Sequence, residues 1–225
     1  MPKNHARKME MGFSLIELLI AMTITLVVLG ITANLLASSF NLRARENQRS
    51  DAMADAQRAL NIMTREIANT GFGLANNGVV AADSGLSTIR VRANLNAFEG
   101  QTTSNSVSDR NEDVKYSLYS TTTASYIVRL DIGTQNQTTV LANRVDALKI
   151  HYYGAKVNYT ASGSDCNIST ASPEVTQKSD TKYIVMSVCV ELPARGARNS
   201  PGYQPASRVQ LVSDVYLRNA DIINY

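Results

Sequence analysis

The residue whose type and position are hardest to explain by packing alone is Glu17, a carboxylate at the start of a long apolar segment. Between Glu17 and Arg43 the sequence contains no charged residue, and this run is long enough to cross a bilayer as a helix. A carboxylate near hydrocarbon costs roughly 2.5 kcal/mol or more unless it is paired. We therefore expect Glu17 to be functional; the alternative is a glutamate that snorkels to the membrane interface.

Other side chains that could do chemistry are sparse. His5 and His151 are the only histidines in the chain, which excludes His-rich metal sites and disfavours most His-dependent catalysis. The sequence has no Gly-rich phosphate loop, nucleophile elbow or zinc-ligand spacing. A net charge of +3 is too weak to indicate a nucleic-acid partner. We expect a non-catalytic protein without a cofactor.

The densest group of oxygen ligands consists of Asp109, Glu112 and Asp113, with Asn111 among them. Calcium prefers such ligands, but this run lacks the spacing of an EF-hand loop. The sequence favours a solvated turn over a calcium site, and no metal site is predicted.

Residues 1–12 form a short leader in which three Lys or Arg side chains face one acid. A positive flank before a single apolar span stays in the cytoplasm and places the following chain outside. An ordinary secretory signal peptide has an apolar region of about 7–15 residues, and the run here is longer. A plain single-span anchor explains the length and the basic flank but leaves Glu17 unexplained.

Beyond the apolar segment the sequence predicts that the same helix continues, from about residue 14 to residue 69. No proline interrupts residues 13–70, and Gly71 and Gly73 are plausible terminators. Apolar side chains recur at three- and four-residue steps on one face. The members of this stripe are Leu42, Met53, Ala56, Leu60, Met63 and Ile67. A membrane anchor followed by a coiled-coil stalk is the alternative, although only about two heptads repeat.

From about residue 85 the composition becomes typical of β-strands separated by polar loops at 99–112, 133–137 and 158–180. The predicted strands are Thr88–Arg92, Asp113–Ser120, Ser125–Asp131, Thr138–Leu141, Val145–Tyr153, Lys182–Leu192 and Arg208–Arg218. The part around Tyr183 is nearly all apolar and indicates a central strand. We expect an α+β fold in which one long helix packs on an antiparallel sheet.

Cys166 and Cys189 are the only cysteines, and both fall on the exported side of the predicted span. Because that compartment is oxidising, we expect one disulfide that joins the long loop to the central strand. The alternative is a buried, free Cys189 with an exposed Cys166.

The run Gly12-Phe13-Ser14-Leu15-Ile16-Glu17, after a basic leader and before an apolar helix, resembles the type IV prepilin signature. The resemblance implies that a membrane prepilin peptidase cuts between Gly12 and Phe13 and N-methylates Phe13. It also implies that Glu17 meets the N-terminal ammonium of a neighbouring subunit, as an assembly residue rather than a catalytic one. The implied segments are a cleaved leader (1–12), a transmembrane and filament-core helix (13–42), an amphipathic half of the spine helix (43–70) and an exported β-rich domain (71–225).

The end of the helix and the late strands VDALKIHYYG, KYIVMSVCVELP and VQLVSDVYLRN are similar to W-type minor pilins and to J-type minor pseudopilins of type II secretion. Related major pilins carry a proline where their helix melts during assembly, whereas this chain has Gly30 and Asn34 there. The resemblance implies a minor pilin that initiates a filament or forms its tip. A pseudopilin and a DNA-uptake pilus subunit are the alternatives within the family, and an exported enzyme is the alternative outside it.

The same resemblance implies the partners and the location. The partners would be other pilins, the prepilin peptidase, an inner-membrane assembly platform and membrane lipid, with no clear nucleic-acid site. The chain would cross the inner membrane once, with its β-rich domain outside the cytoplasm, before it enters the filament.

Overall fold

A computed structural model describes residues 13–97, 107, 109–133, 136–163, 165–200 and 202–221. The chain divides into two compact units. One contains the chain up to Arg45 together with Arg195–Gln204, and the other contains Glu46–Ala194 and the chain from Pro205 onward.

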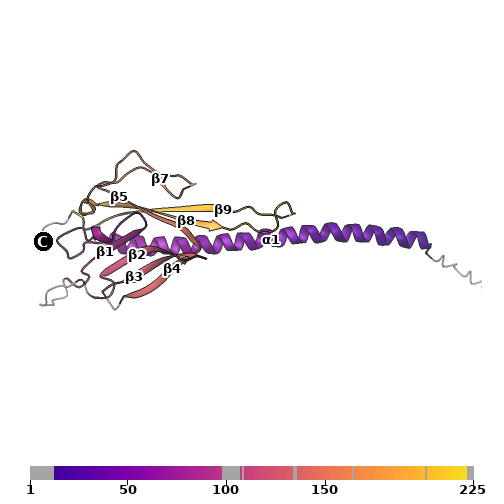
Figure 1. Ribbon diagram of the computed structural model, residues 1–225, viewed down its shortest axis with the longest axis horizontal. Coiled ribbons are helices and arrows are strands. Elements are labelled where there is room, and N and C mark those ends of the chain that lie inside the picture. The colour runs from indigo at the N-terminus through magenta and orange to yellow at the C-terminus, as the bar shows by residue number, and fades with distance from the viewer. Residues whose placement is uncertain are drawn as a thin grey trace, which may run out of the picture. The chain divides into compact units, whose positions relative to one another are not determined.

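The longest element is helix α1, Leu15–Ala68, which confirms the predicted helix (Figure 1). It runs through Gly30 without a break, and the Asn34 side-chain amide donates to the Gly30 carbonyl at 3.0 Å. The hydroxyls of Thr25 and Ser38 likewise donate to the carbonyls four residues before them. These side chains satisfy their hydrogen bonds on their own helix, so they are tolerated in an apolar segment.

The strands form antiparallel sheets, and the α+β class is confirmed, but the prediction of one sheet is wrong. The first sheet has the order β1-β2-β3-β4, with β1 Thr88–Arg92, β2 Asp113–Ser120, β3 Ser125–Asp131 and β4 Gln137–Asn143. The second has the order β5-β8-β9, with β5 Val145–Tyr153, β8 Tyr183–Leu192 and β9 Ser207–Tyr216. The chain leaves the first sheet at Arg144, whose left-handed φ of 58° separates β4 from β5.

Short elements complete the fold. The predicted 158–180 loop contains a two-stranded ribbon and a 3₁₀ turn, and another 3₁₀ turn precedes β1. These are β6 Thr160–Ala161, β7 Ile168–Ser169, η2 Lys178–Asp180 and η1 Ala81–Asp83.

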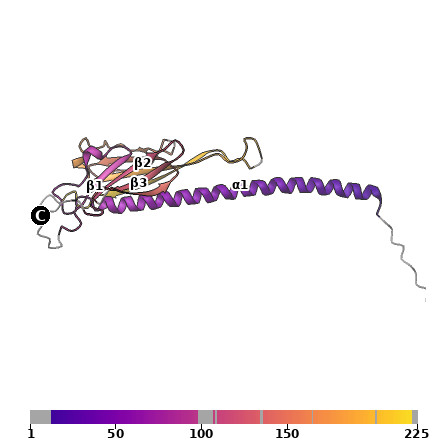
Figure 2. The same cartoon turned by 60° about the horizontal axis from the view of Figure 1, so that its bottom comes forward.

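The main core lies between the second half of α1 and the sheets, and Figure 2 shows β1, β2 and β3 along this part of the helix. The buried helix residues are Ala52, Ala56, Ala59, Leu60, Met63, Ile67 and Ala68. The predicted stripe is therefore right from Ala56 onward but wrong at its start. Leu42 is 48% exposed, Met53 is only partly buried, and the small side chain of Ala52 makes the contact instead.

Strand β8 is buried on both faces, which explains its continuous apolar sequence. Ile184 and Met186 point into the main core. Tyr183 and Val185 alternate with them and pack in a second cluster, under the connection that carries Val157 and Ile168. The prediction of a central strand is confirmed, since β8 lies between β5 and β9.

Candidate functional site

The predicted assembly segment begins at Phe13, the first described residue, whose side chain is 80% exposed. Gly12 and the rest of the predicted leader lie outside the described residues. The Ser14 carbonyl accepts hydrogen bonds from the amides of Glu17 at 3.0 Å and Leu18 at 3.1 Å. These bonds form the first turn of α1, which places Phe13 and Glu17 about one helical turn apart.

The Glu17 carboxylate is exposed and has no side-chain partner among the described residues. It lies at the start of a helix that is long and apolar enough to cross a membrane, and none of the apolar stretch is buried inside the described chain. The exposed large side chains here include Leu15, Ile16, Leu19, Met22, Leu26, Leu29, Leu35 and Phe40. A carboxylate in such surroundings can recruit a cation supplied by another molecule.

The acidic run around residue 111 is solvated only in its first part, because Asp109 and Asn111 are exposed in a turn. The prediction of a solvated turn is wrong for the two acids that follow. Glu112 and Asp113 are only 2% and 3% exposed. The two Glu112 carboxylate oxygens accept hydrogen bonds from the backbone amides of Leu95, at 2.8 Å, and Asp109, at 3.2 Å. Glu112 therefore ties two loop segments together instead of facing water.

Asp113 lies between two arginines of β1. Its carboxylate accepts from Arg90 Nε at 2.7 Å and from Arg92 Nε at 2.8 Å. Burial by itself raises the pKa of Asp113, but hydrogen bonds from Arg90 and Arg92 more than offset it, so the pKa is below its ordinary value. Among the described residues, no three His, Cys, Asp or Glu side chains are grouped so that they could hold a metal ion. Glu112 and Asp113 instead bind backbone amides and arginine side chains of the fold.

A second buried polar group links α1 to the first sheet, and sequence reasoning did not identify it. Arg129 Nε donates to Glu66 Oε2 at 2.9 Å, and the Tyr116 hydroxyl donates to the same oxygen. Burial and the adjacent Glu66 carboxylate raise the pKa of Tyr116. The available signal was Glu66 itself, an acid next to the predicted stripe residue Ile67.

The two cysteines form a disulfide, with Cα atoms 5.7 Å apart, as the sequence predicts. Cys166 lies between β6 and β7, and Cys189 lies on β8, where both are fully buried. The bond attaches the 154–182 connection to the outer face of the second sheet.

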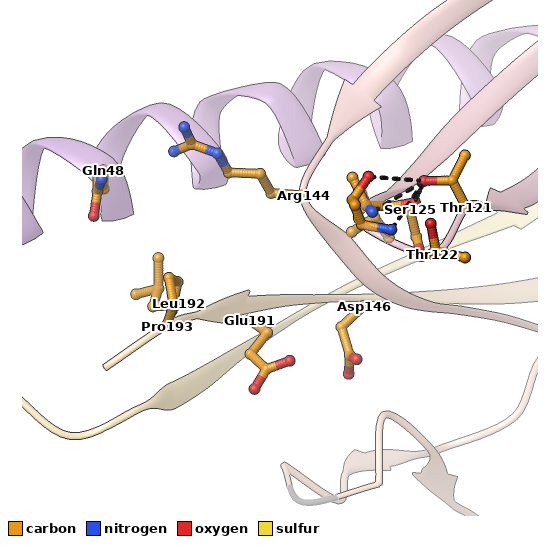
Figure 3. Close-up of a pocket in the computed structure, with 12 residues that line it drawn as sticks. Gln48, Thr121, Thr122, Ser125, Arg144, Asp146, Glu191, Leu192 and Pro193 are labelled. Atoms are coloured by element: carbon orange, nitrogen blue, oxygen red, sulfur yellow. Dashed lines mark hydrogen bonds between the residues drawn. The ribbon is translucent and has the colours of Figure 1, made fainter. Parts of the chain in front are cut away.

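The Glu46–Ala194 unit also has an open cleft of about 480 Å³ (Figure 3). Arg144 extends toward α1, while the carboxylates of Asp146 and Glu191 lie on the opposite side of the cleft. Asp146 is paired with Arg208. The cleft is polar and holds no pairing of a nucleophile with a base among its lining residues.

His151 offers no catalytic arrangement either. Its Nδ1 lies 2.7 Å from Glu174 Oε1, and its buried Nε2 has no partner among the residues that the structure describes. A nucleophile activated by this histidine would need a hydroxyl or thiol within hydrogen-bond reach of Nε2. The exported-enzyme alternative gains no support from this geometry.

Comparison with known proteins finds a known motif in this N-terminal segment. The prokaryotic N-terminal methylation motif matches residues 7–33, a range that includes Gly12, Phe13 and Glu17. No curated protein sequence matches the chain. Among solved structures, the chain is similar to a type IV-like pilin from Thermus thermophilus, with 12% identity and a TM-score of 0.39, over 75% of this chain and 97% of that one.

The matched motif covers the end of the predicted leader, the unpaired carboxylate and the first part of the exposed apolar helix. Behind it, one long helix is followed by antiparallel sheets. The chain thus carries the prokaryotic N-terminal methylation motif at the head of its long helix.

Proposed function

We propose that this pilin-like subunit is a minor pilin, which initiates a type IV pilus-like filament or forms its tip. The observation that carries the proposal is Glu17, a carboxylate without a described partner at the head of an exposed apolar helix that bears the methylation motif. The protein acts mechanically: the apolar half of α1 packs in the membrane or the filament, and the β-rich part presents a surface.

Processing prepares the contact that Glu17 makes. Prepilin peptidase hydrolyses the Gly12–Phe13 peptide bond, and the new amino group of Phe13 is then N-methylated. The amine keeps its positive charge after methylation, so it can pair with the Glu17 carboxylate of a neighbouring subunit. In a low dielectric this attraction is much stronger than at a surface, and each charge left alone would be costly. The pair therefore sets the axial register of each added subunit.

Two features support a minor subunit over a major one. This chain lacks the proline at which major pilins melt. Helix α1 is accordingly continuous through Gly30 and Asn34. The β-rich part carries two main sheets and a disulfide-attached cover over β8. A large exported part of this kind suits a subunit present in few copies at one end of a filament.

A minor pseudopilin of a type II secretion system is the second candidate. The uninterrupted helix and the similarity of the late strands to J-type subunits support it equally well. The processing and the Glu17 contact would be the same in both machines. A deletion strain separates them, because loss of pili or motility indicates a pilus and loss of exported protein indicates secretion.

The experiment that tests the proposal is the intact mass and N-terminal sequence of the chain extracted from membranes without reductant. Cells with an active prepilin peptidase should yield N-methyl-Phe13 as the first residue. Gly12→Leu should abolish cleavage, because the bulky side chain keeps the peptidase from the backbone.

Gly30→Leu is the matched control. A Cβ at Gly30 would meet nothing within 4 Å in the described chain, so this variant should be processed normally. A wild-type chain that still begins at Met1 in these cells would refute the proposal. Equal processing of Gly12→Leu and wild type would refute the assigned cleavage site.

A further inference from the structure

The loop between β8 and β9 lies against α1. Its residues Arg195–Gln204 form one compact unit with the chain up to Arg45. The two strands that the loop connects belong to the other unit. Arg195 and Gln204 exchange two backbone hydrogen bonds of 2.8 Å, which close the base of the loop. The loop is drawn in yellow beside α1 in Figure 1.

The contact of this loop with α1 is close and needs a glycine. Gly202 has a left-handed φ of 80°, and an added Cβ would lie 2.7 Å from the Cα of Ser38. No other residue type fits both this conformation and this approach. The loop backbone therefore lies directly on the helix backbone at the level of Ser38.

Ser38 marks the outer end of the apolar segment. The uncharged stretch from Leu18 to Phe40 spans about 34 Å as a helix, slightly more than the roughly 30 Å of bilayer hydrocarbon. Ser38 lies two residues before Phe40 and five before Arg43, the next charged residue. When the helix crosses the membrane, the loop consequently lies at the depth of the lipid headgroups on the outer side.

The loop has the composition of a membrane interface. It carries Arg195, Arg198 and Tyr203 and no acidic residue. Arg198 is exposed, and so is Arg43 on the helix. Neither of these two arginines has a side-chain partner among the described residues. Arginine is attracted to the anionic phosphate of lipid headgroups, and tyrosine is enriched at this depth.

We propose that Arg43 and the loop Arg195–Gln204 form a binding site for the phosphate headgroups of anionic phospholipids in the outer leaflet of the membrane. The site would hold the unassembled subunit at a fixed depth until it enters the filament. This inference rests on the proposed function, because it requires the apolar half of α1 to span a membrane. Charge complementarity and continuity with the apolar segment favour lipid over an acidic face of a second subunit.

The test uses the full chain, processed and reconstituted in phosphatidylcholine vesicles that contain trace spin-labelled phosphatidylglycerol or phosphatidylcholine. Electron spin resonance then gives the relative association of the two lipids with the protein. We expect a preference for phosphatidylglycerol that falls about fivefold for each neutralised loop arginine, since one arginine near an anionic surface contributes about 1 kcal/mol. Arg195→Gln with Arg198→Gln should nearly abolish the preference, and so should high salt.

Arg58→Gln with Arg65→Gln is the matched control. Both arginines are exposed on α1, at least 15 residues beyond Arg43, so the preference should be unchanged. Gly202→Val displaces the loop without changing any charge and should also lower the preference. Near-ultraviolet circular dichroism checks that the variants stay folded.

Three outcomes distinguish failure of the lipid site from failure of the membrane anchor. Protein that floats with the vesicles but keeps its full preference in the loop variants would overturn the lipid site and leave the proposed function intact. Loop variants that keep the lipid preference but no longer enter filaments would assign the loop to a neighbouring subunit, which also overturns the lipid site. Wild-type protein that does not float would overturn the membrane anchor itself.

Discussion

The two halves of helix α1 differ in what covers them. From Leu15 to Phe40, large apolar side chains lie on every face and stay exposed in the described chain. From Ala52 to Ala68, most apolar side chains lie on one face and are buried in the main core, whereas Met53 and Ile62 stay partly exposed. One continuous helix thus presents an apolar surface that its own chain leaves open and another that its own chain buries.

This difference shows where each half obtains its stability. The amphipathic half is stabilised by packing within the chain, so its sequence alternates between core and solvent. The apolar half exposes far more hydrophobic surface than a soluble monomer tolerates, so it requires lipid or other helices around it. Mutations in the amphipathic half should consequently affect folding, whereas mutations in the apolar half should affect assembly.

Glu17→Ala should have the largest effect, and it should act on assembly alone. Removing one member of a buried charge pair costs about 3–5 kcal/mol, or roughly a hundredfold or more in subunit affinity. The amount of the chain in sheared filaments, relative to the membrane pool, measures this loss. Glu46→Ala is the control in the other half, because Glu46 is also an exposed carboxylate. Normal incorporation of Glu17→Ala would show that Glu17 does not set the axial register of the subunit in the filament.

Met63→Ala should destabilise the β-rich part by about 2–5 kcal/mol, because Met63 is 0% exposed and its truncation leaves a cavity. Met22→Ala is the same change at a side chain that is 62% exposed, and it should alter stability by less than about 0.5 kcal/mol. Denaturant titrations of the full chain in detergent, followed by near-ultraviolet circular dichroism of its tyrosines, compare the two. Equal losses would mean that the halves do not differ as described.

Cys166→Ser with Cys189→Ser should lower stability by about 2–4 kcal/mol, because the disulfide restricts the unfolded chain. The effect should concentrate in the 154–182 connection, which covers the outer face of β8. Hydrogen exchange read by mass spectrometry should show faster exchange there and little change in the amphipathic half of α1. Uniform faster exchange across the β-rich part would contradict a local role for the bond.

Asp113→Asn should have the smallest effect, about 2 kcal/mol at pH 7, and the effect should depend on pH. The folded-state pKa of Asp113 is lowered, so its ion pairs stabilise the protein fully above the unfolded pKa of about 3.9. That stabilisation is lost as the pH falls below 3.9 through the folded pKa. The difference between wild type and variant should therefore shrink from pH 5 toward pH 2.

Asp51→Asn is the control for this titration, because Asp51 is exposed on α1. Its stability difference from wild type should stay small at every pH. A difference for Asp113→Asn that did not change with pH would show that the side chain acts through packing and not through its charge.

The sequence by itself determined those features that depend on local patterns. The apolar run and the absence of proline predicted α1 within one residue at each end, and alternation predicted most strand bounds. The motif residues Gly12, Phe13 and Glu17 were also visible, because their identity and spacing are a local signal. Their roles in cleavage, methylation and assembly remain predictions.

Only the tertiary structure decided which distant residues meet. The register of β1 against β2 places Arg92 opposite Asp113, so an acid that was predicted to face water is buried and paired with arginine. The left-handed turn at Arg144 divided one expected sheet into two. The contact of Gly202 with Ser38 placed a basic loop on α1. The ion pairs of Asp113 and the contact of Gly202 with Ser38 join residues far apart in the sequence, and local periodicity does not show which distant residues meet.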